Sequence, residues 1–113
     1  MRLKSEIFVS ALMRRVFAAG GFAAIERKGA EEAGAVFIRQ HLRDGRENLF
    51  CPAPQSFAED SEVGAERRFE QRLKETTAQQ VDALLENELR FDADLWVVEL
   101  ETESVDDLFT LVA

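Results

Sequence analysis

Residues Thr77–Glu101, TAQQVDALLENELRFDADLWVVELE, decide the fold of this chain. Thr77 followed by Gln80 is a capping-box pattern, so a helix is expected to begin there. Apolar residues then recur at helical spacing and form one buried stripe: Val81, Leu84, Leu85 and Leu89. The acidic segment Phe91–Asp94 turns the chain into an expected strand over Leu95–Glu101. In that strand Leu95, Val97 and Glu99 share one face, and Trp96, Val98 and Leu100 share the other.

The N-terminal half predicts one helix and three strands. The helix is expected from about Ser5 to Ala19, with Ser5 as N-cap and Gly20-Gly21 ending it. The strands are expected over 22–28, 35–42 and 47–51, arranged as a β-meander. Asp44-Gly45 is a strong hairpin signal between the second and third strands. Pro52 and Pro54 end the third, because proline cannot donate to a strand ladder.

Two further segments each allow two interpretations. In residues 66–75, Phe69 and Leu73 fit either a helix or one face of a strand. We favour a fourth strand, because the next helix begins almost at once. For residues 105–112 we expect a short final helix capped by Ser104, and a strand is the alternative.

The element order α-βββ(β)-α-β-α indicates an α+β fold. We expect a four- to five-stranded, mainly antiparallel sheet with the helices packed on one face. A chain of 113 residues is expected to form one domain over 1–113. Its polar segment at about 55–65 predicts a loop.

Charge and composition exclude several classes of function. The net charge is −8, with six basic and two acidic groups in residues 1–28 but five basic and sixteen acidic groups in residues 59–113. This balance argues against nucleic-acid binding, which depends on clustered Lys and Arg. The chain has no membrane-length apolar run, and Arg14-Arg15 cut the N-terminal apolar run too early for an export signal. A single cysteine, Cys51, fits a reducing cytoplasm.

Four stretches give the chain a resemblance to a known family. They are MRLKSEIFVSALMRR at the start, AGAVFIRQ over 33–40, ERRFEQRL over 66–73 and LRFDADLWVVELE over 89–101. They resemble a family of short bacterial proteins that is catalogued as a domain of unknown function. The most specific part runs from Arg90 to Glu99. The resemblance implies a bacterial cytoplasmic domain, and it implies no activity, cofactor or catalytic residue.

The best candidates for a ligand site are arginines near a pair of acids. Arg67, Arg68 and Arg90 could pair with Asp92 and Asp94, because a guanidinium matches a carboxylate or another anion through two hydrogen bonds. Asp92-Ala-Asp94, with Glu99 and Glu101 following, also resembles a set of ligands for a hard cation. We interpret the two aspartates instead as turn residues that cap backbone amides, and we predict no metal site.

Other candidates have structural explanations that compete with functional ones. Trp96 is expected in the core, or as a partner contact if its edge reaches the surface. Arg14 and Arg15 flank the apolar stripe of the first helix, either as solvated charges or as a basic patch. His41 is the single histidine and Cys51 the single thiol, so neither predicts catalysis alone.

These observations favour a non-catalytic protein-interaction or regulatory module without a cofactor. The expected partner is a protein, and a second copy of this chain is one candidate. The alternative is a small-ligand or anion-binding domain, or a minor enzyme, with its site around residues 67–68 and 90–94. The lack of a phosphate-binding glycine loop, a nucleophile elbow, HExxH or CxxC leads us to favour the interaction module.

Overall fold

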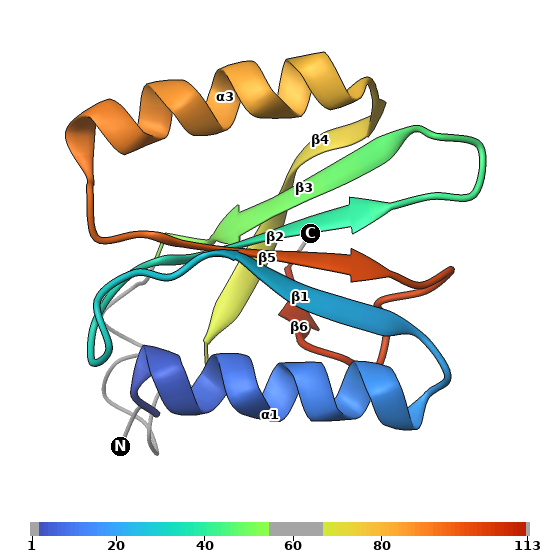
Figure 1. Ribbon diagram of the computed structural model, residues 1–113, viewed down its shortest axis with the longest axis horizontal. Helices are drawn as coiled ribbons and strands as arrows, with labels where there is room; N and C mark the ends of the chain where they lie inside the picture. The colour runs from blue at the N-terminus through green and yellow to red at the C-terminus, as the bar shows by residue number, and fades with distance from the viewer. Residues whose placement is uncertain (1–2, 55–66, 113) are drawn as a thin grey trace.

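The computed structural model describes residues 3–54 and 67–112, in which a sheet lies between two helical layers (Figure 1). The loop predicted at about 55–65 lies outside the described residues. The elements are α1 (Ser5–Ala18), β1 (Phe22–Arg27), β2 (Val36–His41), β3 (Glu47–Pro52), β4 (Arg68–Thr76), α3 (Ala78–Phe91), β5 (Trp96–Glu101) and β6 (Thr110–Leu111).

The sheet confirms the α+β class and is larger than expected. Its strand order is β1-β5-β2-β3-β4-β6. The pairs β1–β5, β2–β3 and β3–β4 are antiparallel, whereas β2–β5 and β4–β6 are parallel. The described part therefore has six strands in place of four or five. The first three strands are not a meander, because β5 enters between β1 and β2.

The prediction that both helices cover one face of the sheet is wrong. Figure 1 shows α1 below the sheet and α3 above it. Side chains therefore sort into two cores, and β2 supplies Val36 and Ile38 to the α1 side but Phe37 to the α3 side. The physical reason is visible in the apolar runs of β2 and β5. Strands without polar alternation must be covered on both faces.

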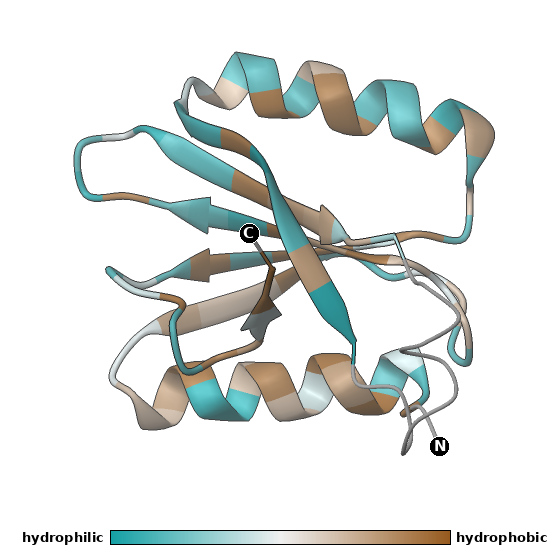
Figure 2. Cartoon of the chain, turned by 180° about the vertical axis from the view of Figure 1, so that it is seen from behind, coloured by the Kyte–Doolittle hydropathy of each residue, from teal (hydrophilic) through white to brown (hydrophobic). Residues whose placement is uncertain are grey.

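The larger core lies between the sheet and α1. It contains Phe8, Val9, Leu12, Val16, Ala23, Val36, Ile38, Phe50, Phe69, Trp96, Val98, Leu100, Val105, Leu108 and Phe109. Phe69 is at its centre, stacked on Phe8 at 5.6 Å and meeting Phe109 edge-on at 5.0 Å. Figure 2 shows hydrophobic residues recurring along α1, and those that are buried include Phe8, Val9, Leu12 and Val16. Aromatic contacts thus join α1, β4 and the C-terminal segment.

The two helix starts differ from each other in how they are capped. At α3 the Thr77 hydroxyl accepts a hydrogen bond from the Gln80 amide at 3.2 Å, as the capping-box pattern predicts. At α1 the N-cap is Lys4, and Ser5 is the first helical residue. The Ser5 hydroxyl instead donates to the Gly34 carbonyl at 2.5 Å. The expected Ser5 cap is therefore wrong, because a buried hydroxyl finds a tertiary partner.

Both ambiguous segments are strands. Residues 68–76 form β4, as we favoured. The predicted final helix at 105–112 is wrong, because this segment makes turns and then the short strand β6. Ser104 does accept the Asp106 amide at 3.2 Å, but it caps only a turn. The buried Phe109 and the Val112 amide, which donates to the Phe69 carbonyl at 2.8 Å, hold the segment extended.

Gly29 provides a test of how closely the β1–β2 connection approaches β5. A Cβ at this position would overlap the carbonyl oxygen of Asp94 and lie 2.6 Å from the carbonyl carbon of Leu95. Because both are backbone atoms, Gly29→Ala should lower the free energy of unfolding by about 2 kcal/mol or more. Urea denaturation will measure this as a lower midpoint at unchanged slope.

The matched control is Gly45→Asn in the hairpin. Gly45 has φ +90° with no atom within 4 Å of an added Cβ, and asparagine tolerates that conformation. We expect a loss below about 1 kcal/mol. Equal losses for the two variants would contradict a packing role for Gly29.

Candidate functional site

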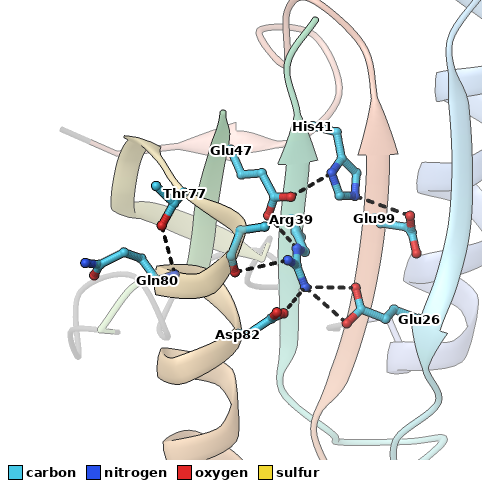
Figure 3. Close-up of polar contacts among 9 residues, drawn as sticks. Glu26, Arg39, His41, Glu47, Thr77, Gln80, Asp82 and Glu99 are labelled. Carbon is cyan, nitrogen blue, oxygen red and sulfur yellow. Dashed lines mark hydrogen bonds and ion pairs between the residues drawn. The ribbon is translucent and has the colours of Figure 1, made fainter. Parts of the chain in front are cut away.

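A buried arginine in the middle of β2 organises a cluster of polar side chains on the sheet. Arg39 is 6% exposed and points to the side of the sheet that carries α3. Its Nε donates to Glu47 Oε1 at 2.6 Å, and its Nη1 donates to Asp82 Oδ1 at 2.8 Å and Glu26 Oε2 at 3.3 Å. Its Nη2 donates to the Ala78 carbonyl at 3.4 Å. Figure 3 shows this guanidinium joining three strands to the start of α3.

The pairing between Arg39 and Glu47 sets the energetics of the cluster. Both residues are buried, and a buried charge is tolerated only when it is paired and hydrogen-bonded. Burial alone would lower the pKa of Arg39, but the hydrogen bonds that it donates to Glu47 and Asp82, together with the charges of Glu47 and Glu26, outweigh burial and raise that pKa. The guanidinium is therefore a permanent cation that holds its carboxylates in place.

His41 extends the cluster from Arg39 toward the surface. Its Nδ1 lies 3.0 Å from Glu47 Oε2, and its Nε2 lies 3.3 Å from Glu99 Oε1. A neutral imidazole has one N–H, so both contacts are hydrogen bonds donated by the ring only in the imidazolium form. The imidazole therefore links the buried Glu47 to Glu99, which is partly exposed on β5.

The cluster has more acids than cations. Glu26, Glu47, Asp82 and Glu99 contribute four carboxyl groups, against Arg39 and the ring of His41. The pKa of Glu26 is raised, chiefly because burial disfavours its charged form, while Arg39 partly opposes that rise. Nearby Glu99 and Asp82 raise it further. This excess of negative charge makes the site suited to attracting a cation or retaining a proton.

An open groove of about 870 Å³ begins where the cluster reaches the surface. It is lined by residues 19–21, 41–43, 101–104 and 107–108 together with Glu99. These positions are the end of α1, the ends of the parallel strands β2 and β5, and the turn after β5. His41 and Glu99 belong to both the cluster and the groove wall.

An exposed aromatic pair lies next to this groove. Phe17 near the end of α1 and Phe22 at the start of β1 are each 49% exposed. Their rings meet edge-on with centroids 5.9 Å apart. Phe22 is the cross-strand partner of Glu101, which lines the groove. Ile25, further along β1, is also exposed.

Three of the predicted arginines, Arg14, Arg15 and Arg67, lie on the α1 side of the molecule. Arg67 is buried, donates to Ser5 Oγ at 2.8 Å and lies over the Phe8 ring at 5.5 Å. Arg68 is exposed on β4. Arg14 is exposed on α1, and Arg15 Nη1 donates to the Leu108 carbonyl at 3.0 Å. The structure thus gives Arg67 and Arg15 fold-stabilising contacts.

The predicted group at 90–96 lies at the other helix end. Arg90 is exposed in the last turn of α3. Asp92 Oδ1 accepts the Asp94 amide at 3.0 Å, which is the turn geometry expected for these aspartates. Trp96 is 1% exposed, and its Nε1 donates to the Ala30 carbonyl at 2.7 Å. Arg67 therefore anchors the start of α1, while Asp92 and Asp94 shape the turn after α3.

Sequence reasoning did not select Arg39 or Glu47, and it gave His41 no function. Two signals could have identified them. Arg39 and His41 alternate with Phe37 on one face of a strand that is otherwise apolar, and such a position requires a buried partner. Glu47 faces His41 across the Asp44-Gly45 hairpin, so its carboxylate was the natural partner.

The side chains of the described residues are not arranged as a metal site or as a reactive-thiol site. Within residues 3–54 and 67–112, no three His, Cys, Asp or Glu side chains are close enough to hold a metal ion. Cys51 is buried against α3, and burial is the main cause that raises the pKa of its thiol. What the arrangement offers is an acidic, concave surface with an imidazole in its wall.

Comparisons with known proteins identify relatives of the whole chain. The family model "Protein of unknown function (DUF1491)" matches residues 3–110. No match to this sequence is found among the curated proteins.

Three solved structures are similar over almost the full length. A solution structure of a protein from A. tumefaciens has 68% identity and a TM-score of 0.89, covering 99% of this chain and 96% of that one. A crystal structure of a DUF1491 family protein from Caulobacter crescentus has 33% identity and a TM-score of 0.78, covering 100% of both. An NMR structure of a Caulobacter crescentus family member has 34% identity and a TM-score of 0.79, covering 100% of this chain and 99% of that one.

Removing Arg39 should be costly because it leaves Glu47 buried without its cation. We expect Arg39→Met to lower the free energy of unfolding by about 3 kcal/mol. The double variant Arg39→Met/Glu47→Gln should lose less, because no unpaired buried charge remains. Urea denaturation of the variants measures both. The control is Arg43→Met, which breaks the exposed Arg43–Glu103 pair and should change little. If the double variant lost as much stability as the two single substitutions added together, Arg39 and Glu47 would not be energetically coupled.

The raised pKa of Glu26 predicts a pH dependence of stability. Between the ordinary glutamate pKa and the raised folded-state pKa, the folded chain binds more protons than the unfolded chain, so stability falls as pH rises. Glu26→Gln removes this term. Relative to the parent, the variant should therefore gain stability as pH rises from about 4 to about 8. Denaturation midpoints across that range test it. A variant that instead loses stability toward high pH would show that the ion pair with Arg39 dominates.

Proposed function

We propose that this chain, which belongs to the DUF1491 family of proteins of unknown function, is a non-catalytic protein-interaction module of the bacterial cytoplasm. The observation that supports this most is the half-exposed pair Phe17–Phe22. Neither ring is needed to fill the main core, which already contains Phe8, Phe50 and Phe69.

The corner where α1 passes into β1 has the composition of a docking surface. Two aromatic rings remain accessible on adjacent elements, and Phe17 contacts Phe22 edge-on. Aromatic side chains that are already ordered lose little entropy on binding, so they often dominate an interface. β1 is also an edge strand, whose outer backbone groups are available to a partner.

The net charge favours a different protein over a second copy as the occupant. Each chain carries a charge of −8, so two copies repel each other at long range. A partner with an apolar anchor and a net positive charge would be attracted to the same surface.

The cytoplasmic part of the proposal is supported by the cysteine chemistry. Cys51 is the single cysteine and is buried against α3. A lone thiol in the core is compatible with a reducing compartment. In the described part of the chain, no helix has the length and apolarity to cross a bilayer.

The test is partner capture that depends on Phe22. Tagged parent protein should retain a basic protein from a lysate of the native host, and Phe22→Ser should reduce its retention at least tenfold, because an anchoring aromatic contributes about 2 kcal/mol. The matched control is Phe91→Ser. Phe91 is 84% exposed at the far end of α3, and its loss should have no effect. The captured protein is then purified, and calorimetry measures its affinity for the parent chain, for Phe22→Ser and for Phe91→Ser.

Two outcomes would overturn the proposal. One is retention that is equal for the Phe22 and Phe91 variants. The other is light scattering that shows the parent alone as a dimer of its 12.8 kDa chain and the Phe22 variant as a monomer, which would make a second copy the occupant.

A further inference from the structure

We infer that the groove at the ends of β2 and β5 binds an arginine side chain of the partner. This inference rests on the proposed function, because it names the chemistry of the residue beside the apolar anchor. It is carried by the concave shape of the groove, by its charge and by its position next to Phe22.

The groove is formed by four segments that meet at one end of the sheet, where β2 and β5 finish. The parallel strands β2 and β5 end side by side, with His41 the register partner of Glu101. The α1–β1 turn closes a second side and lies so near β5 that a Cβ on Gly21 would be 2.8 Å from the Glu101 carbonyl oxygen. The turn after β5 brings Leu108 into the lining. A space of about 870 Å³ is ample for one long side chain.

The charge of the lining is strongly negative. Glu99, Glu101, Glu103 and Asp107 line the groove, against the single permanent cation Arg43. Arg43 Nε already pairs with Glu103 at 3.1 Å, and Glu99 is shared with His41. Of the ion pairs found within residues 3–54 and 67–112, none involves Glu101 or Asp107. Two carboxylates are therefore left to meet an incoming cation.

The polar cluster behind the wall, which shares His41 and Glu99 with the groove, points the same way. Arg39 and His41 serve four carboxyl groups, so this cluster offers no spare cation to neutralise the groove. A cation supplied from outside would lower the electrostatic energy of both the groove and the cluster, which share Glu99.

The neighbouring aromatic ring favours arginine over lysine or a metal ion. Phe22 and Glu101 are direct cross-strand partners, so their side chains lie on the same face of the sheet. A guanidinium is planar and can bond to a carboxylate while it lies against an aromatic ring. An ammonium ion can also lie over a ring, but it lacks the planar fork that bonds a carboxylate at two points while the same group stacks on the ring.

The experiment needs no knowledge of the partner. Backbone amide signals of the ¹⁵N-labelled chain are followed by NMR while N-acetyl-arginine amide is added at low ionic strength. We expect shifts concentrated at residues 41–43 and 99–104. The uncharged isostere N-acetyl-citrulline amide should bind at least tenfold more weakly, because it forms no charge-assisted hydrogen bond.

Glu101→Gln is the informative variant because Glu101 has no ion pair within the described residues whose loss could disturb the fold. It should weaken arginine-amide binding about tenfold. Glu86→Gln, at an exposed position of α3, changes the net charge equally and should leave binding unchanged. Equal effects of the two variants, or equal binding of citrulline amide, would overturn the inference as nonspecific attraction to an acidic protein.

The two proposals fail separately. If arginine amide does not bind but capture still depends on Phe22, the interaction module stands and the groove assignment falls. If arginine amide binds but capture is indifferent to Phe22, the groove is a cation site and the apolar docking surface falls.

Discussion

The parallel pairing of β2 with β5 is the constraint on which the rest of this structure depends. It aligns Val36 with Trp96 at one end and His41 with Glu101 at the other. A parallel pair cannot be joined by a tight turn, so the intervening chain must form other elements before it returns. Here it forms β3, β4 and α3, and α3 crosses the face opposite α1 (Figure 1). The two strands are thereby buried on both sides.

The same pairing determines where polar groups gather. Parallel strands end at the same edge, so the polar ends of β2 and β5 lie side by side. α3 meets Arg39 through its first turns, at Ala78 and Asp82. Along β2 the side chain of Arg39 is 8% exposed, whereas that of His41, two residues on, is 29% exposed. The cluster occupies the boundary between core and solvent.

Local signals in the sequence predicted local structure well. The Thr77 cap, the strand at 68–76, the alternation in β5 and the aspartate turn at Asp92–Asp94 each depend on neighbouring residues, and each is present. The insertion of β5 between β1 and β2 depends on contacts distant in sequence, so no local pattern could reveal it. Without it, the covered faces and the meeting of His41 with Glu99 could not be derived.

The final segment shows how contacts that are distant in sequence can also decide the structure of a single element. Residues 105–112 have helical spacing and a serine at the expected cap, but a helix this short has little stability of its own. Burial of Phe109 against Phe50 and Phe69 outweighs that local preference. The competition between weak local propensity and strong aromatic packing therefore explains why the prediction failed there.

The phenylalanines divide into buried and exposed ones, and the proposed docking surface uses two of the exposed ones. Phe8, Phe37, Phe50, Phe69 and Phe109 are buried, whereas Phe17 and Phe22 are half exposed beside an acidic groove. Apolar exposure would promote self-association, while a charge of −8 opposes it at long range. A surface with exposed rings beside negative charge selects its partner by charge during the first encounter, and the rings then add affinity. This combination is what the proposed interaction module would need in order to recognise a basic, apolar segment of a partner.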